Sequence, residues 1–195
     1  MGHSTHMLAR AHYSAIGTRT MSGKTPDLSR LESVVSTSVL DAMRAAGRRL
    51  SELGVRHLIV GGLAVAAHGY LRATRAVDFL VGDEAFEHHG GGIVTMRPGV
   101  PIQVGGVMVD HLSVQTVDAH LTQNLPAATV ELAVAPIDVL VFLKLNSPRP
   151  RDRVDIAELI RAGADVEQCR AYLQTNAPQF LSKLEEIVAE AWRED

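Results

Sequence analysis

Hydrophobic residues recur at the helical period at both ends of the chain. Between Thr25 and Gly54 they stand at positions 31, 34, 35, 39, 43 and 50, which places them on one helical face. A proline directly after Thr25 is typical of a helix start, and glycine at 54 is typical of an end. This pattern predicts one long packing helix over residues 26–53. Similar spacing predicts helices over residues 153–162, 166–174 and 178–192, with Gly163 as a C-cap.

The middle of the chain has shorter apolar runs, which are typical of strands. They predict strands over residues 57–60, 77–81 and 129–134, and a hairpin of residues 100–104 and 107–112 around a Gly-Gly turn. Helices are expected over residues 63–68 and 136–145, and one or two helical turns over residues 83–89 that end at the glycines 90–92. The order predicts an α+β fold: a small mixed sheet, an N-terminal packing helix and a C-terminal helical part.

Length and composition favour one compact unit. The 195 residues divide into an expected tag or disordered leader (1–25, with an organellar transit peptide as the alternative), an α/β core with its N-terminal helix (26–135) and a helical part packed on the core (136–195). A net charge of −3 gives no strong field, so a nucleic-acid partner would need a local basic patch. The longest apolar runs are too short to span a bilayer, and the single cysteine, Cys169, cannot form an intrachain disulfide. We therefore expect a soluble cytoplasmic protein without a membrane partner.

The first candidate for chemistry is the glycine pair Gly61-Gly62, between a predicted strand and a predicted helix. Free backbone amides favour phosphate at such a position, and the missing side chains allow it to approach closely. A simple structural turn is the alternative explanation.

Two aspartates form the second candidate. Asp78 and Asp110 each interrupt an otherwise apolar predicted strand, where burying an isolated carboxylate is costly. Together they would form a polar site, because alternate strand residues point to one face and a neighbouring strand can complete the cluster. The alternative is that each lies exposed at the end of its strand.

The segment over residues 61–81 contains four short elements in order. They are Gly-Gly-x-Ala from Gly61, His-Gly from His68, Arg-x-Thr from Arg72, and Ala-Val-Asp, which ends at Asp78. This order resembles the minimal nucleotidyltransferases of the AbiEii-type toxin group. The resemblance extends over residues 55–159, because Lys144, Arg149, Arg151, Asp152 and Asp155 resemble downstream elements of that group.

The resemblance implies specific roles. Gly61, Gly62, Arg72 and Thr74 would bind the nucleotide, Asp78 and Asp110 would hold Mg²⁺ or Mn²⁺, and the two acids with Lys144 would carry catalysis. Simpler explanations stay open for several positions. Arg72 could be solvated, Lys144 could extend its ammonium to solvent from a helix end, and His68 could only finish a helix. Arg151, Asp152 and Asp155 could be helix N-terminal charges in solvent-facing pairs.

The chain departs from the family pattern at Ala76, where the first acid of an acidic-x-acidic pair is expected. Losing this ligand should weaken two-metal catalysis. We therefore expect a nucleotidyltransferase-like protein that transfers NMP from an NTP to a hydroxyl or an RNA end, weakened by Ala76. The alternatives are an inactive nucleotide- or partner-binding regulatory module of the toxin-antitoxin kind, and a scaffold that shares only ancestry. The expected partners are a nucleoside triphosphate, an RNA or protein acceptor, and an antitoxin-like protein.

Overall fold

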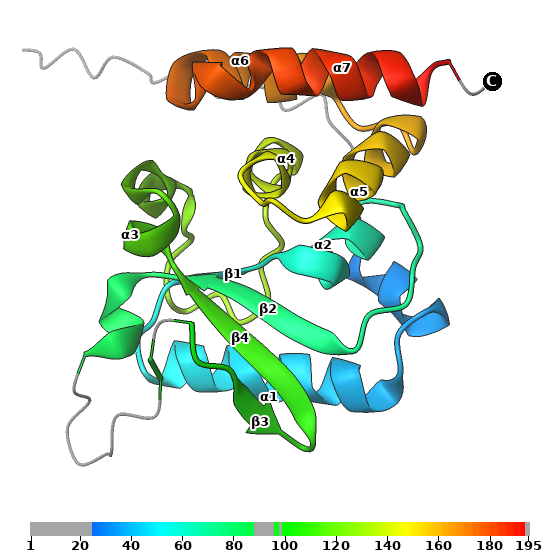
Figure 1. Ribbon diagram of the computed structural model, residues 1–195. Helices are drawn as coiled ribbons and strands as arrows, with labels where there is room; N and C mark the ends of the chain where they lie inside the picture. The colour runs from blue at the N-terminus through cyan, green and yellow to red at the C-terminus, as the bar shows by residue number, and fades with distance from the viewer. Residues whose placement is uncertain (1–24, 88–95, 98, 194–195) are drawn as a thin grey trace, which may run out of the picture.

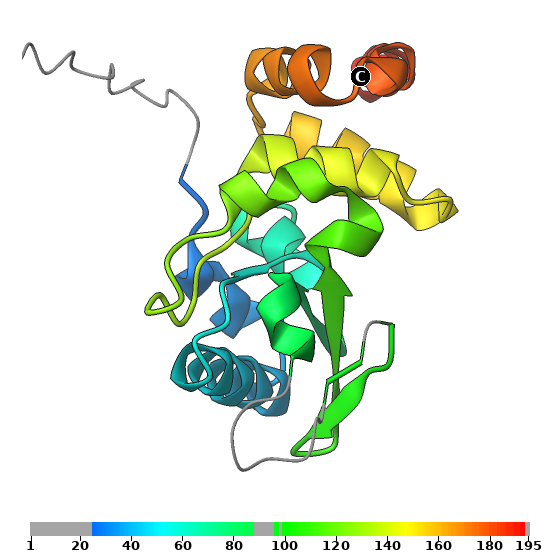
Figure 2. The same cartoon turned by 90° about the vertical axis from the view of Figure 1, so that its left-hand side faces the viewer.

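The computed structural model describes residues 25–87, 96–97 and 99–193. The expected leader, apart from Thr25, and the expected helix end at residues 88–92 lie outside the described residues. A central sheet separates a single long helix on one side from a group of helices on the other (Figures 1 and 2). This arrangement confirms the predicted α+β class.

The sheet is mixed and has the strand order β1-β2-β4-β3. Strands β1 (His57–Ile59) and β2 (Ala76–Val81) are antiparallel, β2 and β4 (Val107–Ser113) are parallel, and β3 (Ile102–Val104) pairs antiparallel with β4. The predicted hairpin is confirmed: Gly105 and Gly106 connect β3 to β4 with φ of +57° and +80°, which glycine adopts readily.

Helix α1 (Thr37–Glu52) covers one face of the sheet and packs in one cluster with Val77, Phe79 and Val109. The prediction of a single helix over residues 26–53 is wrong. A 3-10 helix, η1 (Leu28–Ser33), comes first, and Ser36 then starts α1 from an extended conformation. The bend between them lets Leu31 pack, fully buried, in the same cluster. Apolar spacing alone cannot reveal such a bend, because both segments present apolar residues to the same core.

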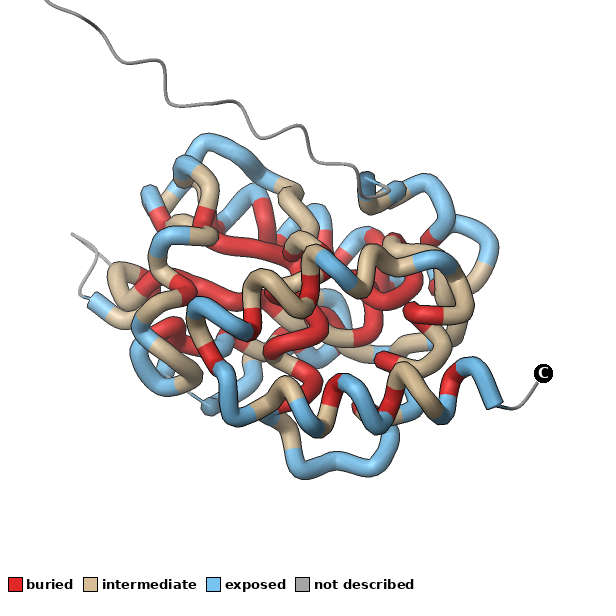
Figure 3. The backbone as a smooth tube through the Cα atoms, turned by 90° about the horizontal axis from the view of Figure 1, so that it is seen from above, coloured by how far each residue is buried: buried red, intermediate tan, exposed pale blue. Residues whose placement is uncertain are grey.

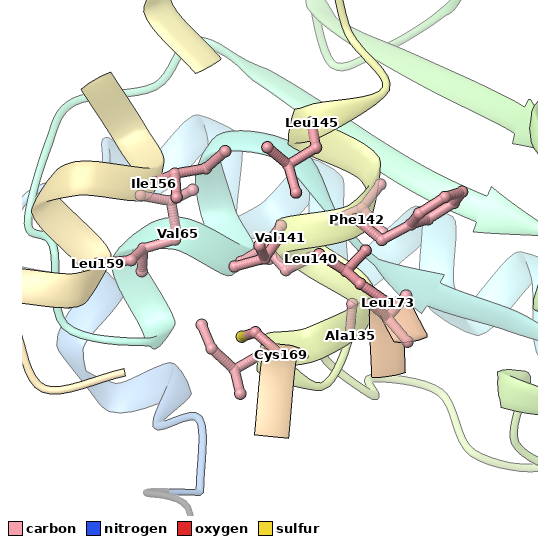
Figure 4. Packing of buried hydrophobic residues seen from close by; sticks show 14 of the residues in the cluster. Val65, Ala135, Leu140, Val141, Phe142, Leu145, Ile156, Leu159, Cys169 and Leu173 are labelled. Carbon is pink, nitrogen blue, oxygen red and sulfur yellow. The ribbon is translucent and has the colours of Figure 1, made fainter. Parts of the chain in front are cut away.

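The other face carries α2 (Gly61–Ala67), α4 (Ile137–Leu145), α5 (Pro150–Arg161), α6 (Val166–Asn176) and α7 (Leu181–Ala191) (Figure 1). Their buried positions form a second core, and Figure 3 shows buried positions along the backbone. In this core Leu140 and Phe142 of α4 lie among residues of α2, α5 and α6 (Figure 4). Cys169 belongs to this core, and burial raises the pKa of its thiol to about 12. In the described part of the chain, no helix combines the length and apolar character that crossing a membrane requires.

The loop after residue 125 differs from the prediction. The expected strand over residues 129–134 is reduced to one bridge, in which the Ile59 amide donates to the Ala133 carbonyl and the Ala135 amide donates to the Ile59 carbonyl. Thr129 and Val130 have the β-branched side chains that are common in strands, but both are exposed and belong to no strand. Two short elements were not predicted: α3 (Val114–Val117) and the 3-10 helix η3 (Ala119–Asn124). The 3-10 helix η2 (Asp83–Phe86) agrees with the predicted one or two helical turns, and the helix predicted over residues 178–192 is formed by the 3-10 helix η4 (Pro178–Phe180) followed directly by α7.

Candidate functional site

Asp78 and Asp110 lie side by side at the centre of the sheet. They are register partners in the parallel pair β2–β4, and both are half-buried. Neighbouring strands are about 4.8 Å apart, so the two carboxylates share one small volume. They lie inside their strands, so the alternative that each is exposed at a strand end is wrong. Since Val77, Phe79 and Val109 face α1, alternation turns both acids to the opposite face.

The shared position changes the acidity of Asp78. Burial, followed by the negative charge of Asp110, raises the pKa of Asp78 above its usual value of 3.8. The charges of Arg149 and Lys144 and a hydrogen bond from the Gly62 amide act in the opposite direction. A pair of close carboxylates in which one pKa is raised is a site that a cation would stabilise.

The glycine pair forms the wall beside Asp78. Gly61 has a φ of +60°, and a Cβ at this position would lie 2.0 Å from Asp78 Oδ2. A Cβ on Gly62 would lie 2.8 Å from Thr74 Oγ1. A side chain at either position would therefore collide with Asp78 or Thr74, so glycine is required there. A simple structural turn would need only the backbone freedom of glycine and not this close contact. The Gly62 amide acts on the Asp78 carboxylate and lowers its pKa, so it belongs to the surroundings of the acid pair.

An open cleft of about 650 Å³ spreads from the two acids. All seven residues predicted for the site line it: Gly61, Gly62, Arg72, Thr74, Asp78, Asp110 and Lys144. Arg75, Arg149, Arg151 and Asp152 complete its charged wall. Five of the lining side chains are basic and three are acidic, on a chain whose net charge is −3. This local basic patch makes the cleft suitable for an anion.

Lys144 connects the cleft to a buried charged cluster. Its Nζ donates to Asp152 Oδ1 at 2.7 Å and to Asp155 Oδ2 at 2.5 Å. The lysine is only 5% exposed, so the alternative of an ammonium extended to solvent is wrong. Two carboxylates hold Nζ, so Lys144 is fixed in position beside the acids of the cleft.

Two arginines also bind the carboxylates of this charged cluster. Arg72 Nη2 donates to Asp155 Oδ2 at 2.8 Å, and Arg72 Nε lies equally close to Oδ1 without the alignment of a hydrogen bond. Arg149 Nε donates to Asp152 Oδ2 at 2.8 Å, which raises the pKa of the guanidinium. Arg72 is thus held by a buried acid, and the alternative of a merely solvated arginine is wrong.

Asp152 and Asp155 are buried, so the solvent-facing pairing considered for these α5 residues is wrong. Burial would raise the pKa of Asp152, but hydrogen bonds from Lys144, Ser147 and Arg149 outweigh it and lower that pKa. Asp152 is therefore ionised at neutral pH and fixes Lys144 and Arg149 at the cleft. Arg151, in contrast, is exposed at the rim.

The residues present suit one hard divalent cation better than two. Asp78 and Asp110 offer oxygen ligands, and Mg²⁺ normally completes its shell with water and phosphate oxygens. Ala76 lies two residues before Asp78 on the same face and lines the same cleft, so it contributes a methyl group where a third carboxylate would stand. Across the described residues, no group of three or more His, Cys, Asp or Glu side chains is arranged to hold a metal.

Sequence reasoning missed part of the site. Arg75 lines the cleft, and its position next to Thr74 in the Arg-x-Thr element was the available signal. A second lobe of about 300 Å³ adjoins the two acids; its lining is mixed, with Leu112, Val117, Leu140 and Leu143 on its apolar part and Lys144, Asn146, Ser147 and Arg149 among its polar residues. Of these, Val117 belongs to α3, which the sequence pattern did not reveal.

His68 lies outside the cleft lining. Its Nε2 lies 2.8 Å from the Ala135 carbonyl oxygen, which agrees with a local structural role at the end of α2. Burial is the main cause that lowers its pKa.

No family model matches the chain, and no curated protein does either. The resemblance to nucleotidyltransferases therefore depends on the residues of the cleft themselves.

Proposed function

We propose that this chain is a nucleotidyltransferase-like protein that binds a nucleoside triphosphate together with one divalent cation in the cleft. The observation that carries the proposal is the pairing of Asp78 with Asp110 across β2 and β4, opposite a wall of arginines. Two adjacent acids attract a cation, and the surrounding basic side chains attract a polyphosphate. Few simple ligands other than a metal-bound nucleotide or polyphosphate satisfy both requirements.

The proposed roles follow from position. Asp78 and Asp110 would hold Mg²⁺ or Mn²⁺, which when bound neutralises phosphate charge and lowers the pKa of an attacking hydroxyl. Arg75, Arg149 and Arg151 would contact the phosphate oxygens, since their guanidinium groups suit bidentate phosphate binding. Lys144 and Arg72 are held by Asp155, so they would add positive charge in fixed positions. The apolar part of the second lobe, with Leu112, Leu140 and Leu143, would give a flat nucleobase a surface to pack against.

The proposed reaction is NMP transfer. The oxygen of an acceptor hydroxyl, on an RNA end or a protein, would bond to the α-phosphorus while the bond to the pyrophosphate oxygen breaks. Its proton would leave to water or to a carboxylate. Ala76 should make this step slow, because one unit of negative charge is missing where a second cation would bind.

A nucleotide-binding regulatory module is the second candidate. It is favoured by one observation: Ala76 lines the cleft where a third carboxylate would stand. In this case binding would persist without transfer, and the ligand would affect contact with a protein partner of the antitoxin kind.

One experiment tests the proposal and separates the two candidates. Binding of ATP, GTP, CTP and UTP would be measured by calorimetry with and without Mg²⁺ for the native chain, Asp110→Asn and Asp41→Asn. Asp41 is an exposed residue of α1, so its variant is a matched control. Transfer of α-³²P label to RNA and protein pools would be measured for the native chain and Ala76→Asp.

We expect Mg²⁺-dependent binding that Asp110→Asn removes and Asp41→Asn retains. Weak transfer by the native chain that Ala76→Asp increases supports the weakened enzyme. Binding without transfer by either version favours the regulatory module. Absence of Mg²⁺-dependent triphosphate binding at millimolar nucleotide would overturn the proposal.

A further inference from the structure

The basic cleft and the second lobe meet at the acid pair. The cleft of about 650 Å³ and the lobe of about 300 Å³ share the lining residues Gly61, Asp78, Asp110, Lys144 and Arg149. In the function proposed above, the nucleobase packs in the second lobe and the outer phosphates lie among the arginines of the cleft. The sugar and the α-phosphate then have to cross the boundary between the two, which the shared residues form.

A side-chain hydroxyl lies beside this boundary. Ser147 lines the second lobe, and its Oγ accepts hydrogen bonds from the amide and the Nε of Arg149 at 3.3 and 3.2 Å. Among the described residues that line the cleft and the lobe, Thr74 carries the other side-chain hydroxyl. Thr74 lines the cleft and not the lobe, and its Oγ1 donates to the Ala76 carbonyl oxygen at 3.3 Å. Ser147 is therefore the hydroxyl that contacts a boundary residue directly.

The contact between Ser147 and Arg149 is one that a phosphate group can replace. Arg149 Nε lies closer to Asp152 Oδ2, at 2.8 Å, than to Ser147 Oγ, and the side chain of Arg149 is 73% exposed. Guanidinium groups bind phosphate oxygens strongly, so a phosphate at the boundary would compete with Ser147 for this N–H group. The competition would free a lone pair of Oγ at the place where the phosphate arrives, which is the arrangement that attack by a hydroxyl requires.

A local turn before α5 explains only part of this arrangement. The hydrogen bond from the Arg149 amide to Ser147 Oγ is typical of a serine that stabilises such a turn. A turn does not require the side chain to line a lobe whose walls also include both acids, as Ser147 does.

We propose that Ser147 is a self-modification site, at which the chain transfers NMP from a bound triphosphate to its own hydroxyl; this inference rests on the proposed nucleotidyltransferase function. In this step Oγ bonds to the α-phosphorus, the bond from the α-phosphorus to the pyrophosphate oxygen breaks, pyrophosphate leaves, and the hydroxyl proton goes to solvent. The product is a phosphodiester on Ser147 that occupies the second lobe. The modification would therefore block the binding of a further triphosphate and switch the site off.

The test incubates the full chain with Mg²⁺ and each α-³²P-labelled nucleoside triphosphate, without added RNA or protein. Protein-bound label is measured, and the labelled peptide is identified by mass spectrometry. The native chain and Ala76→Asp are each compared with versions that carry one further change. Ser147→Ala removes the hydroxyl, Ser147→Thr keeps it, and Ser182→Ala changes an exposed serine of α7 as the matched control.

We expect one labelled peptide, which contains Ser147, and faster labelling of Ala76→Asp than of the native chain. Ser147→Ala should lose this label, Ser147→Thr should retain part of it, and Ser182→Ala should retain all of it. Because the nucleotide and the hydroxyl lie in one molecule, the labelled fraction after a given time should not change when the protein is diluted about tenfold. The labelled chain should no longer bind triphosphate in calorimetry.

Label on another residue, label that survives Ser147→Ala, or a labelled fraction that falls on dilution would overturn the self-modification. Mg²⁺-dependent triphosphate binding without protein-bound label in either background would also overturn it, and this result would leave the proposed nucleotide binding intact. Absence of Mg²⁺-dependent binding by the native chain would overturn both proposals, so calorimetry separates the two failures.

Discussion

Gly61 lies directly against the carboxylate of Asp78: a methyl group on Gly61 would stand 2.0 Å from Asp78 Oδ2. The bend that ends β1 and the acid in the neighbouring strand are therefore built as one unit. The same contact explains why a glycine with a φ of +60° stands there.

Gly61→Ala should be much more damaging than its backbone strain alone explains. Gly54 provides the matched control, because its φ is +71° and an added Cβ there would meet no atom within 4 Å. We expect Gly54→Ala to lower the free energy of unfolding by about 1 kcal/mol and Gly61→Ala by about 3 kcal/mol, since only the second adds a clash. Urea denaturation measures both. Equal losses would show that Asp78 moves aside freely.

Asp110→Asn should stabilise the chain when no divalent cation is present. The carboxylates of Asp78 and Asp110 repel each other, and the charge of Asp110 contributes to the raised pKa of Asp78. Removing that charge should increase the free energy of unfolding by about 1 kcal/mol. Adding Mg²⁺ should raise the melting temperature of the native chain and leave that of the variant unchanged. Asp41→Asn should behave as the native chain does, and a Mg²⁺ response in Asp110→Asn would contradict the two-acid metal site.

Lys144→Met should destabilise the fold because it leaves Asp152 and Asp155 buried with less positive charge. Breaking one partner of a buried ion pair costs about 3 kcal/mol or more. Lys183→Met is the control, since within the described part of the chain its Nζ donates to the Leu145 carbonyl oxygen and to no carboxylate, and we expect a loss of about 1 kcal/mol. Adding Asp155→Asn to Lys144→Met should recover part of the loss in chemical denaturation. Simple additivity of the two changes would argue against coupling.

Arg75→Ala and Arg151→Ala should each weaken triphosphate binding about tenfold, the effect of one lost charge-assisted contact of about 1.4 kcal/mol. Both side chains are exposed at the cleft, so stability should change little. Arg48→Ala, an exposed position of α1, should change nothing. The measurement is calorimetric titration at two salt concentrations, and affinity that is independent of both arginines would place the phosphates elsewhere.

His68→Gln should alter how stability depends on pH. Burial lowers the pKa of His68 in the folded state below 6.5, so the unfolded chain binds the proton more readily. The neutral ring therefore contributes stability above pH 6.5, and this contribution is lost as pH falls from 6.5 through the lower folded value. Glutamine does not titrate and can still donate to the Ala135 carbonyl oxygen.

We therefore expect the native chain to lose stability relative to His68→Gln as pH is lowered from 7.5 to 5, measured by urea denaturation at each pH. A constant difference across this range would contradict a buried neutral His68.

Much of the local structure could be predicted from the sequence, and the elements that could not be predicted share one cause. The strands of Phe79 and Val109 and the hairpin at Gly105 were predictable, because period-two apolar patterns and paired glycines depend on few residues. The break before α1 and the loss of the strand over residues 129–134 were not predictable. Both depend on where distant segments pack: Leu31 against the core, and Ala133 against a three-residue edge strand.

The candidate site divides in the same way. The sequence by itself determined which residue types were present: a glycine bend, one acid in each of two strands, and an alanine where a third acid was expected. Only the tertiary structure decided that Asp78 and Asp110 are register partners, that Asp152 and Asp155 hold Lys144 from inside the protein, and that Ser147 lines the same lobe as the two acids. The physical reason is that a side chain's chemistry belongs to its residue, whereas the partners that burial and charge give it come from segments far away in the chain.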